Sequence, residues 1–264
     1  MTLKQVLTIA GSDSGGGAGI QADLKAMSAN GVFAMSVITA ITAQNTEEVT
    51  DIFELPLSII AAQLDAVFDD FEVSAVKTGM LSSADIVGVV AKMLRPQHVT
   101  NLVVDPVMIS KSGQALLKPD AMEALKRDLI PLALVVTPNI HEAQELSGIQ
   151  IKSLADARQA AKAIIKLGCK HVLIKGGHLL AEKGTDLLYD GRFFSVYKGE
   201  FIESPHTHGT GCTYASAIAA QLARGKSLPD AIQTAKTYIT EAIRHSLAMG
   251  HGRGPTNHFY FLPS

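Results

Sequence analysis

The residues best suited to chemistry form a run near the C-terminal end, Thr-His-Gly-Thr-Gly-Cys from Thr207 to Cys212, followed by a segment rich in Ala and Ser. Gly209 and Gly211 expose backbone N–H groups where that segment begins as a helix, and the helix dipole adds positive potential. Such a site binds an anion and stabilises charge on a transferred phosphoryl group. It also lowers the pKa of a thiol, so we expect Cys212 to be accessible as a thiolate. A purely structural glycine-rich helix start is the alternative.

Lys236 is a charged residue inside an apolar helical stripe. It follows Ile232 by four residues and precedes Ile239 by three, so all three side chains share one helix face. Burying an unpaired ammonium is very costly, so Lys236 must either reach solvent or bind an anionic partner. A phosphate ligand is the functional interpretation.

A second glycine-rich loop, residues 11–19, follows an apolar run near the N-terminus and contains five glycines. The dinucleotide-binding pattern G-x-G-x-x-G fits none of its registers. Gly11 and Gly16 have P-loop spacing, but a Gly-Ala pair replaces the Lys-Ser/Thr pair that a P-loop needs. The loop is therefore either a plain turn or a backbone surface that approaches a ligand closely. Asp23, just beyond it, is a helix-dipole partner or a ligand-binding carboxylate.

Further polar residues lie where apolar runs end. Asp105 follows one such run, a common position for a carboxylate that handles metal ions or phosphate. Asn139 and Glu142 have the spacing of a helix N-cap and its N3 partner, which favours a capping box; the functional alternative is that they hold a hydrated Mg²⁺ beside phosphates. Lys175 ends another run and is followed by two glycines, which allow a nucleotide to approach the backbone.

The fold that positions these groups can be predicted from the pattern of the sequence. Short β-rich runs alternate with segments of helical period. Strands are predicted at residues 6–10, 34–40, 73–77, 101–105, 133–137 and 171–175. Helices are predicted at residues 21–29, 57–70, 84–94, 120–129 and 154–167. This alternation predicts a mostly parallel sheet with helices on both faces. Ligands bind beyond the carboxyl ends of such strands, where the polar residues lie.

The pattern changes after residue 186. Residues 187–194 contain Asp190-Gly191, which predicts a β-hairpin with a tight turn. Two helices, at 212–223 and 229–246, then close the chain. Because no linker, repeat or low-complexity tract interrupts the sequence, we expect a single domain over residues 1–264.

The composition excludes several classes of protein. Apolar residues make up 47% and charged residues 18%, which allows a sizeable core. A net charge of −2 without blocks of like charge gives no case for nucleic-acid binding. No stretch reaches the roughly 18 apolar residues that span a bilayer. Cys169 and Cys212 form no disulfide framework, so we expect reduced thiols in a cytoplasmic protein, with Cys169 inert in the core.

The histidines lack the spacing of a helical metal-binding pair. We expect loop or capping roles for all of those considered, which are His141, His178, His206, His208, His251 and His258. No metal site is therefore predicted from histidine.

Eight ordered segments resemble the hydroxymethylpyrimidine and phosphomethylpyrimidine kinases of thiamine biosynthesis. They are LTIAGSDSGGGAGIQADLK, SVITAITAQNT, KTGML, VVDPVM, TPNIHEA, IKGGH, HTHGTGCTYASAIAA and GHGRGP. The resemblance covers essentially the whole length. It implies the ribokinase-like fold, a three-layer αβα sandwich with a mostly parallel central sheet and a small β-hairpin extension.

The resemblance also implies roles for individual residues. Those that would surround the pyrimidine are Gly11, Asp23, Gln44, Met80 and Val107, with Gln44 and Asp23 pairing with the ring nitrogens and amino group. Those that would bind the nucleotide are Asn139, Lys175, Thr210 and Lys236, while Asp105 and Glu142 would hold Mg²⁺. Gly209 and Gly211 would form the anion hole beside Lys175, and Cys212 would be the base.

The implied reaction uses Mg-ATP to convert 4-amino-5-hydroxymethyl-2-methylpyrimidine to its monophosphate and then to its diphosphate. Many sugar kinases of this fold carry Asp where Cys212 stands, so a thiol base is a departure that would matter mainly in the first step. A pyridoxal or pyridoxine kinase is the alternative enzyme, and a non-catalytic binding protein is the alternative of another class. The family also implies a homodimer.

Overall fold

The computed structural model describes residues 3–109, 113, 116–176 and 183–263, so His178 lies outside the described residues. Its central feature is a nine-stranded sheet with the order β3-β2-β1-β4-β5-β6-β7-β8-β9. The strands are β1 Gln5–Asp13, β2 Phe33–Gln44, β3 Val49–Glu54, β4 Val73–Thr78, β5 Leu102–Val104, β6 Val135–Val136, β7 His171–Ile174, β8 Thr185–Tyr189 and β9 Phe194–Lys198. The six central strands β2, β1, β4, β5, β6 and β7 pair in parallel. The outer strands β3, β8 and β9 pair antiparallel to their neighbours.

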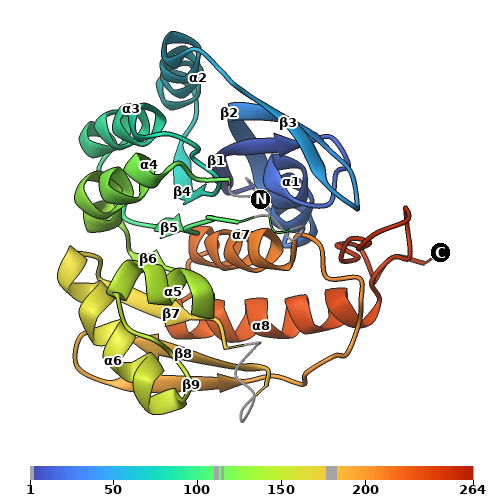
Figure 1. Ribbon diagram of the computed structural model, residues 1–264. Helices are drawn as coiled ribbons and strands as arrows, with labels where there is room; N and C mark the ends of the chain where they lie inside the picture. Colours follow the sequence, from blue (N-terminus) through green and yellow to red (C-terminus); the bar gives the residue numbers. More distant parts are fainter. Residues whose placement is uncertain (1–2, 110–112, 114–115, 177–182, 264) are drawn as a thin grey trace.

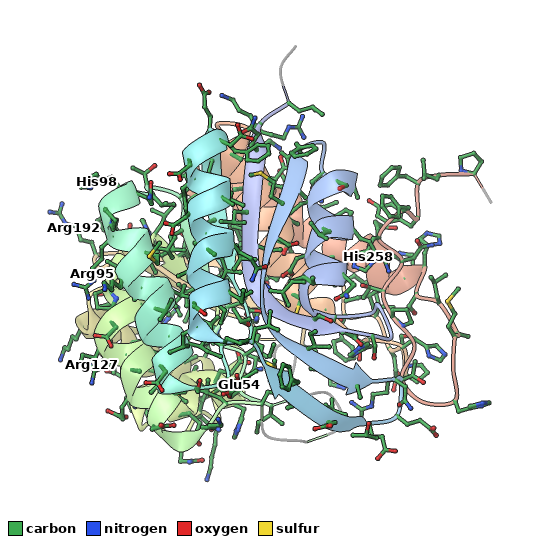
Figure 2. The ribbon with its side chains drawn as sticks, turned by 90° about the horizontal axis from the view of Figure 1, so that it is seen from above. Glu54, Arg95, His98, Arg127, Arg192 and His258 are labelled. Atoms are coloured by element: carbon green, nitrogen blue, oxygen red, sulfur yellow. The ribbon has the colours of Figure 1, made fainter. Side chains whose placement is uncertain are left out.

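Helices cover both faces of this sheet, as the ribbon shows (Figure 1). The α-helices are α1 Gly19–Ala29, α2 Leu57–Asp70, α3 Ala84–Leu94, α4 Pro119–Ala124, α5 Ile140–Ser147, α6 Leu154–Ile164, α7 Thr210–Ala223 and α8 Leu228–Arg244. Shorter helical turns are η1 Arg95–Gln97, η2 Leu125–Leu129, η3 Ile130–Leu132 and η4 Ile165–Leu167. The same order of layers is visible from above, with Arg95, Arg127 and Arg192 at the periphery (Figure 2).

Two hydrophobic cores separate these layers. Val6 of β1 joins a core with α1, α7 and α8, while the next residue, Leu7, joins the core with α2, α3, α5 and α6. Successive side chains of a strand point to opposite faces, so a fully apolar strand serves both cores. The predicted three-layer αβα sandwich is therefore confirmed.

The individual elements mostly match the sequence prediction. The hairpin is present as β8 and β9, and the Asp190 carboxylate accepts the N–H groups of Arg192 and Phe193 in its turn. The helix predicted at 120–129 divides into α4 and the π-helical turn η2. The prediction missed β3, because only Val49 in this edge strand is buried and no continuous apolar run marks it.

The sheet topology selects one edge for the site. β1 lies between β2 and β4. The chain adds β2 and β3 on one side of β1 within the sheet, and it then adds β4 and the later strands on the opposite side of β1. Ligands of open α/β sheets bind at such a reversal, beyond the carboxyl ends of the strands. Asp13 ends β1 and Thr78 ends β4, which places the first glycine loop and the segment after β4 at this edge.

The described part of the chain contains no helix long and apolar enough to cross a membrane. Both cysteines are free thiols. Cys169 is buried in the core, as predicted, and burial raises its pKa to about 12.

Candidate active site

The two glycine-rich loops pack directly against each other. Gly209 precedes α7 with φ 75°, and a side chain there would collide with the carbonyl oxygen of Gly17. A side chain on Gly17 would in turn overlap the ring of His208. Thr210, the first residue of α7, donates its hydroxyl to the carbonyl oxygen of Thr207 at 2.7 Å. The first loop therefore lies against the N-terminus of α7, although almost 200 residues separate them.

Asp13 holds the first loop in shape. Its Oδ1 accepts the N–H of Gly15 at 2.8 Å, and its Oδ2 accepts those of Gly17 at 3.0 Å and Ala18 at 2.7 Å. The same Oδ2 lies 2.9 Å from Nε2 of His208, which is itself buried. Burial alone would raise the pKa of Asp13, but His208 and the backbone N–H groups lower it on balance.

Sequence reasoning missed this pair. The sequence does not predict Asp13 as a site residue. It predicts only a loop or capping role for His208, which does lie in the loop before α7 but whose ring is also a buried hydrogen-bond partner. The available signal was a carboxylate within a glycine loop at a strand end. Nothing in the sequence indicated which histidine would meet it.

Lys175, Asp105 and Gly211 come together at the start of α7. Lys175 Nζ lies 2.7 Å from Asp105 Oδ1, and the hydroxyl of Thr137 donates to the same oxygen at 3.1 Å. A Cβ atom on Gly211 would lie 3.5 Å from Lys175 Nζ and 3.8 Å from Asp105 Oδ2. Burial lowers the pKa of Lys175, but Asp105 and Glu142 outweigh burial and raise it, so the lysine stays charged. A cation thus faces the positive end of the helix.

Asn139 and Glu142 form the predicted capping box of α5. Asn139 Oδ1 accepts the N–H of Glu142 at 2.9 Å, and Glu142 Oε2 accepts the N–H of Asn139 at 2.7 Å. Asn139 also pairs with Lys175 in an isolated parallel bridge. The structural interpretation is confirmed, and the box lies beside the lysine that the functional interpretation requires.

Asp23 requires a correction. It has no exposed surface, its two oxygens lie 2.9 and 2.8 Å from Lys77 Nζ, and it accepts the hydroxyls of Thr8 at 2.6 Å and Ser216 at 2.7 Å. A carboxylate so fully bonded has no position left for a pyrimidine, so the predicted direct contact is not what the structure shows. Asp23 instead anchors a fully buried lysine.

Lys77 is a site residue that sequence reasoning missed. It is the penultimate residue of β4 and is fully buried. Burial lowers the pKa of Lys77, but the charge of Asp23 outweighs burial, and the net pKa is raised. The signal in the sequence was the lysine itself, since a charge in an apolar strand needs a buried partner.

Cys212 also requires a correction. It is the third residue of α7 and is half-buried. Burial raises the pKa of its thiol to about 11; Asp23 and Asp105 add to the increase, and Lys77 opposes it. The helix N-terminus and the lysine do not overcome burial and two carboxylates. The expected lowered pKa is therefore wrong, and Cys212 is a neutral thiol at physiological pH.

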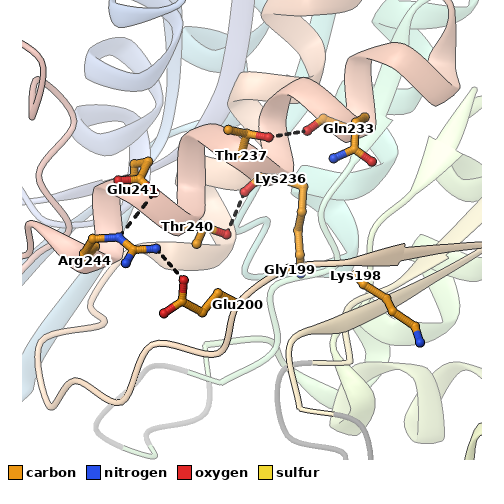
Figure 3. A pocket seen from close by; sticks show the side chains of 9 residues that line it. All are labelled: Lys198, Gly199, Glu200, Gln233, Lys236, Thr237, Thr240, Glu241 and Arg244. Carbon is orange, nitrogen blue, oxygen red and sulfur yellow. Dashed lines mark hydrogen bonds and ion pairs between the residues drawn. The ribbon is translucent and has the colours of Figure 1, made fainter.

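Lys236 has found an anionic partner, but it is a carboxylate. Its Nζ lies 2.7 Å from Asp186 Oδ2, the Tyr214 hydroxyl donates to the same oxygen at 3.0 Å, and Asp186 Oδ1 accepts the N–H of Gly176 at 3.1 Å. Figure 3 shows the lysine stem extending toward Gly199. Both residues line an open pocket of about 200 Å³. Lys236 thus stabilises the backbone just after Lys175 and forms one wall of this pocket.

The remaining predicted residues lie at or just beyond the carboxyl ends of β1, β2, β4 and β5. A side chain on Gly11 would collide with Met80, so the Met80 thioether covers the Gly11 backbone. Gln44 is half-buried, and its Nε2 lies 3.4 Å from His208 Nε2. Val107 is half-buried two residues beyond the strand-end carboxylate. The contact with His208 joins Gln44 to the loop that precedes α7.

No group of three or more His, Cys, Asp and Glu side chains among the described residues is arranged to hold a metal ion. Asp105 and Glu142, however, both act electrostatically on Lys175. Mg²⁺ in phosphoryl-transfer sites is usually held by one or two carboxylates together with substrate phosphates and water. The two carboxylates fit an ion held in that way.

A mostly parallel αβα sandwich that sets a glycine-lined helix N-terminus against a buried lysine has the architecture of a ribokinase-like kinase. The sequence model described as phosphomethylpyrimidine kinase matches residues 13–257, and the chain belongs to that family. The family predicted from the eight segments is confirmed.

Individual relatives agree. A hydroxymethylpyrimidine/phosphomethylpyrimidine kinase from Haemophilus influenzae is 53% identical over 98% of each chain. Among solved structures, an ADP complex of Bacillus subtilis pyridoxal kinase is similar with a TM-score of 0.92 and 42% identity over 98% of this chain and 99% of that one. The structure of a phosphomethylpyrimidine kinase from Clostridium difficile is similar with a TM-score of 0.82 and 51% identity, over 90% of this chain and 99% of that one.

Replacing Asp23 by Asn removes the charge partner of a fully buried ammonium. Because a buried unpaired charge is strongly destabilising, we expect the free energy of unfolding to fall by about 3–5 kcal/mol, measured by urea denaturation. Glu123→Gln removes the carboxylate of the more exposed Glu123–Lys126 pair and should leave this free energy nearly unchanged. Equal losses in the two variants would contradict the importance of the buried pair.

Alkylation of Cys212 by iodoacetamide tests the direction of its pKa. Since the folded-state pKa is raised to about 11, the thiolate fraction at pH 8 is smaller than in the unfolded chain, and the rate should still rise with pH beyond 9. Peptide mass spectrometry measures this rate, and Cys169, which is more deeply buried, should react more slowly still. A rate for Cys212 that levels off below pH 8 is the opposite result.

Proposed function

We propose that this protein phosphorylates the hydroxymethyl group of 4-amino-5-hydroxymethyl-2-methylpyrimidine and then the resulting monophosphate, using ATP and Mg²⁺. The observation that carries the proposal is the contact of Gln44 with His208. It joins the end of the site that selects a ring to the helix start that binds an anion. The family to which the chain belongs supports both activities.

At the phosphoryl-transfer end, the N–H groups of Gly209 and Gly211 at the start of α7 would face the transferred group, and Lys175 would add a fixed positive charge. These groups stabilise charge that develops in the transition state without having to reorganise. Asp105 and Glu142 would hold Mg²⁺, which neutralises phosphate charge when bound. Lys175 occupies Oδ1 of Asp105 at 2.7 Å, so the ion would use Oδ2.

The nucleotide would extend from Lys175 past Asn139 and Thr210 toward Lys236. The pocket of about 200 Å³ beside Lys236 supports this direction. The lysine contributes a wall through its stem while its charge stays on Asp186.

The ring would lie at the other end, between Gly11, Met80 and Val107, with Gln44 at its polar edge. The absence of a side chain at Gly11 leaves room for Met80, whose side chain would supply an apolar wall for the ring. Asp23 and Lys77 support this end from below.

Cys212 would lie nearest the acceptor oxygen. A neutral thiol is a poor base at rest, but phosphoryl transfer demands positioning and charge neutralisation more than proton abstraction. The first acceptor is an alcohol that loses a proton, whereas the second is already anionic. The thiol would therefore matter mainly in the first step.

We also propose that the single-domain protein is cytoplasmic and works as a homodimer. Support for a dimer comes from the family and from an apolar patch, since Ile41 and Phe53 are cross-strand partners on β2 and β3 and are 48% and 64% exposed.

An ADP-release assay with three acceptors tests the function. We expect the hydroxymethylpyrimidine and its monophosphate to be phosphorylated with kcat/KM at least about tenfold above that of pyridoxal, the factor that roughly one lost hydrogen bond produces. Pyridoxal is the essential comparison because the similar Bacillus subtilis structure is a pyridoxal kinase. A preference for pyridoxal would favour the alternative enzyme, and no ADP with any acceptor would favour a binding protein.

Replacing Cys212 by Ser tests the thiol. Because positioned proton-transfer groups contribute about 100-fold or more, turnover of the alcohol should fall by about this factor, and the second phosphorylation should fall less. Nucleotide affinity, measured by calorimetry, should not change. Cys169→Ser, in the core away from the site, is the matched control and should retain turnover. Equal losses in both steps would contradict a role specific to the alcohol.

A further inference from the structure

One nitrogen of His208 contacts two groups at once. Its Nε2 lies 2.9 Å from Asp13 Oδ2 and 3.4 Å from Gln44 Nε2. A ring nitrogen either carries a proton or offers a lone pair, so it cannot donate to one neighbour and accept from the other. One of the two contacts decides its state.

The contact with Asp13 decides it. The Asp13 carboxylate already accepts N–H groups from Gly15, Gly17 and Ala18, and its pKa is lowered, so it is ionised and only accepts hydrogen bonds. At 2.9 Å the histidine must donate. The proton of His208 is therefore on Nε2.

This state makes the contact with Gln44 a meeting of two donors unless the amide is reversed. The oxygen and nitrogen of a side-chain amide are assigned from their hydrogen-bond partners. With the amide turned by 180°, the Gln44 oxygen faces the N–H of His208, and its NH₂ group faces the other neighbour, Thr42.

Thr42 supports the same orientation independently. Its single hydroxyl proton is directed to the carbonyl oxygen of Ser12 at 2.8 Å, the shorter of its two contacts. Its other contact, 3.2 Å to the terminal group of Gln44, then leaves only a lone pair of the hydroxyl oxygen. A lone pair requires an N–H from Gln44. Two separate neighbours thus impose one orientation on the amide.

We infer that His208 is a positioning residue for substrate selection, which donates one N–H to both Asp13 and Gln44 and fixes the direction in which Gln44 presents its amide. The inference rests on the proposed contact between Gln44 and the pyrimidine. With one side of the amide held by His208 and the other by Thr42, one oxygen lone pair and one N–H remain in a fixed order. A ring that carries an amino group next to a ring nitrogen matches that order.

The position of His208 also links the orientation of Gln44 to the loop before α7. The residue directly precedes Gly209, which caps α7, and its ring packs against Gly17. Ring recognition by Gln44 is therefore connected mechanically to the loop that would bind the transferred phosphoryl group.

Two substitutions of His208 separate positioning from packing. A Gln side chain can place its N–H where the histidine Nε2 lies, whereas the shorter Asn side chain cannot. We expect His208→Asn to raise KM for the hydroxymethylpyrimidine about tenfold, the loss typical of one hydrogen bond, with KM for ATP unchanged. His208→Gln should keep KM within about threefold of wild type. A general loss of structure would lower kcat for both variants without separating their KM values, and this result would overturn the inference.

The protonation state is tested without any substrate. Two-dimensional ¹⁵N NMR of the wild-type protein labelled at histidine should show His208 with a proton on Nε2, and an unprotonated Nε2 would overturn the inference. The two proposals fail differently. Wild-type protein that does not phosphorylate the pyrimidine refutes the proposed function, whereas active wild-type protein with equal KM in His208→Asn refutes the positioning role.

Discussion

The site depends on one close backbone contact, the packing of Gly17 against Gly209. Neither position has room for a Cβ atom, and Gly209 needs a positive φ to begin α7. This contact brings the loop after β1 against the start of α7, and the Asp13–His208 hydrogen bond fastens the two together at 2.9 Å. The proposed function requires this distance to be kept, because one loop would face the ring and the other would face the phosphoryl group.

Three buried lysine–carboxylate pairs surround that contact. Lys77 pairs with Asp23 below the site, Lys175 with Asp105 at the helix start, and Lys236 with Asp186 behind the nucleotide side, at distances of 2.7–2.8 Å. Buried pairs cost desolvation energy and are weak evidence for stability alone. In the proposed function these pairs would keep positive charges fixed near the site for phosphate groups. The same carboxylates and burial keep the Cys212 thiol neutral.

The sequence predicted the layers and most of the strands because buried parallel strands read as continuous apolar runs. It also predicted the Asn139–Glu142 box, which is a local pattern over four residues. It missed β3, whose residues are not continuously buried. The expected Cys212 pKa came from its helix position alone, and the expected contact of Asp23 with the ring came from the family resemblance. The actual surroundings include Lys77 for both, and Asp105 for Cys212. The expectations failed because a pKa or an open carboxylate depends on neighbours from other elements.

The sequence by itself determined the family, the glycine loops and the requirement that Lys236 find an anion. These follow from residue types at short spacing, where backbone geometry and helix period leave few possibilities. Only the tertiary structure decided that the anion is Asp186, that Cys212 is a neutral thiol, and which of the histidines meets Asp13. Those outcomes depend on contacts between residues far apart in the chain, and such contacts exist only after the sheet and its helices have packed.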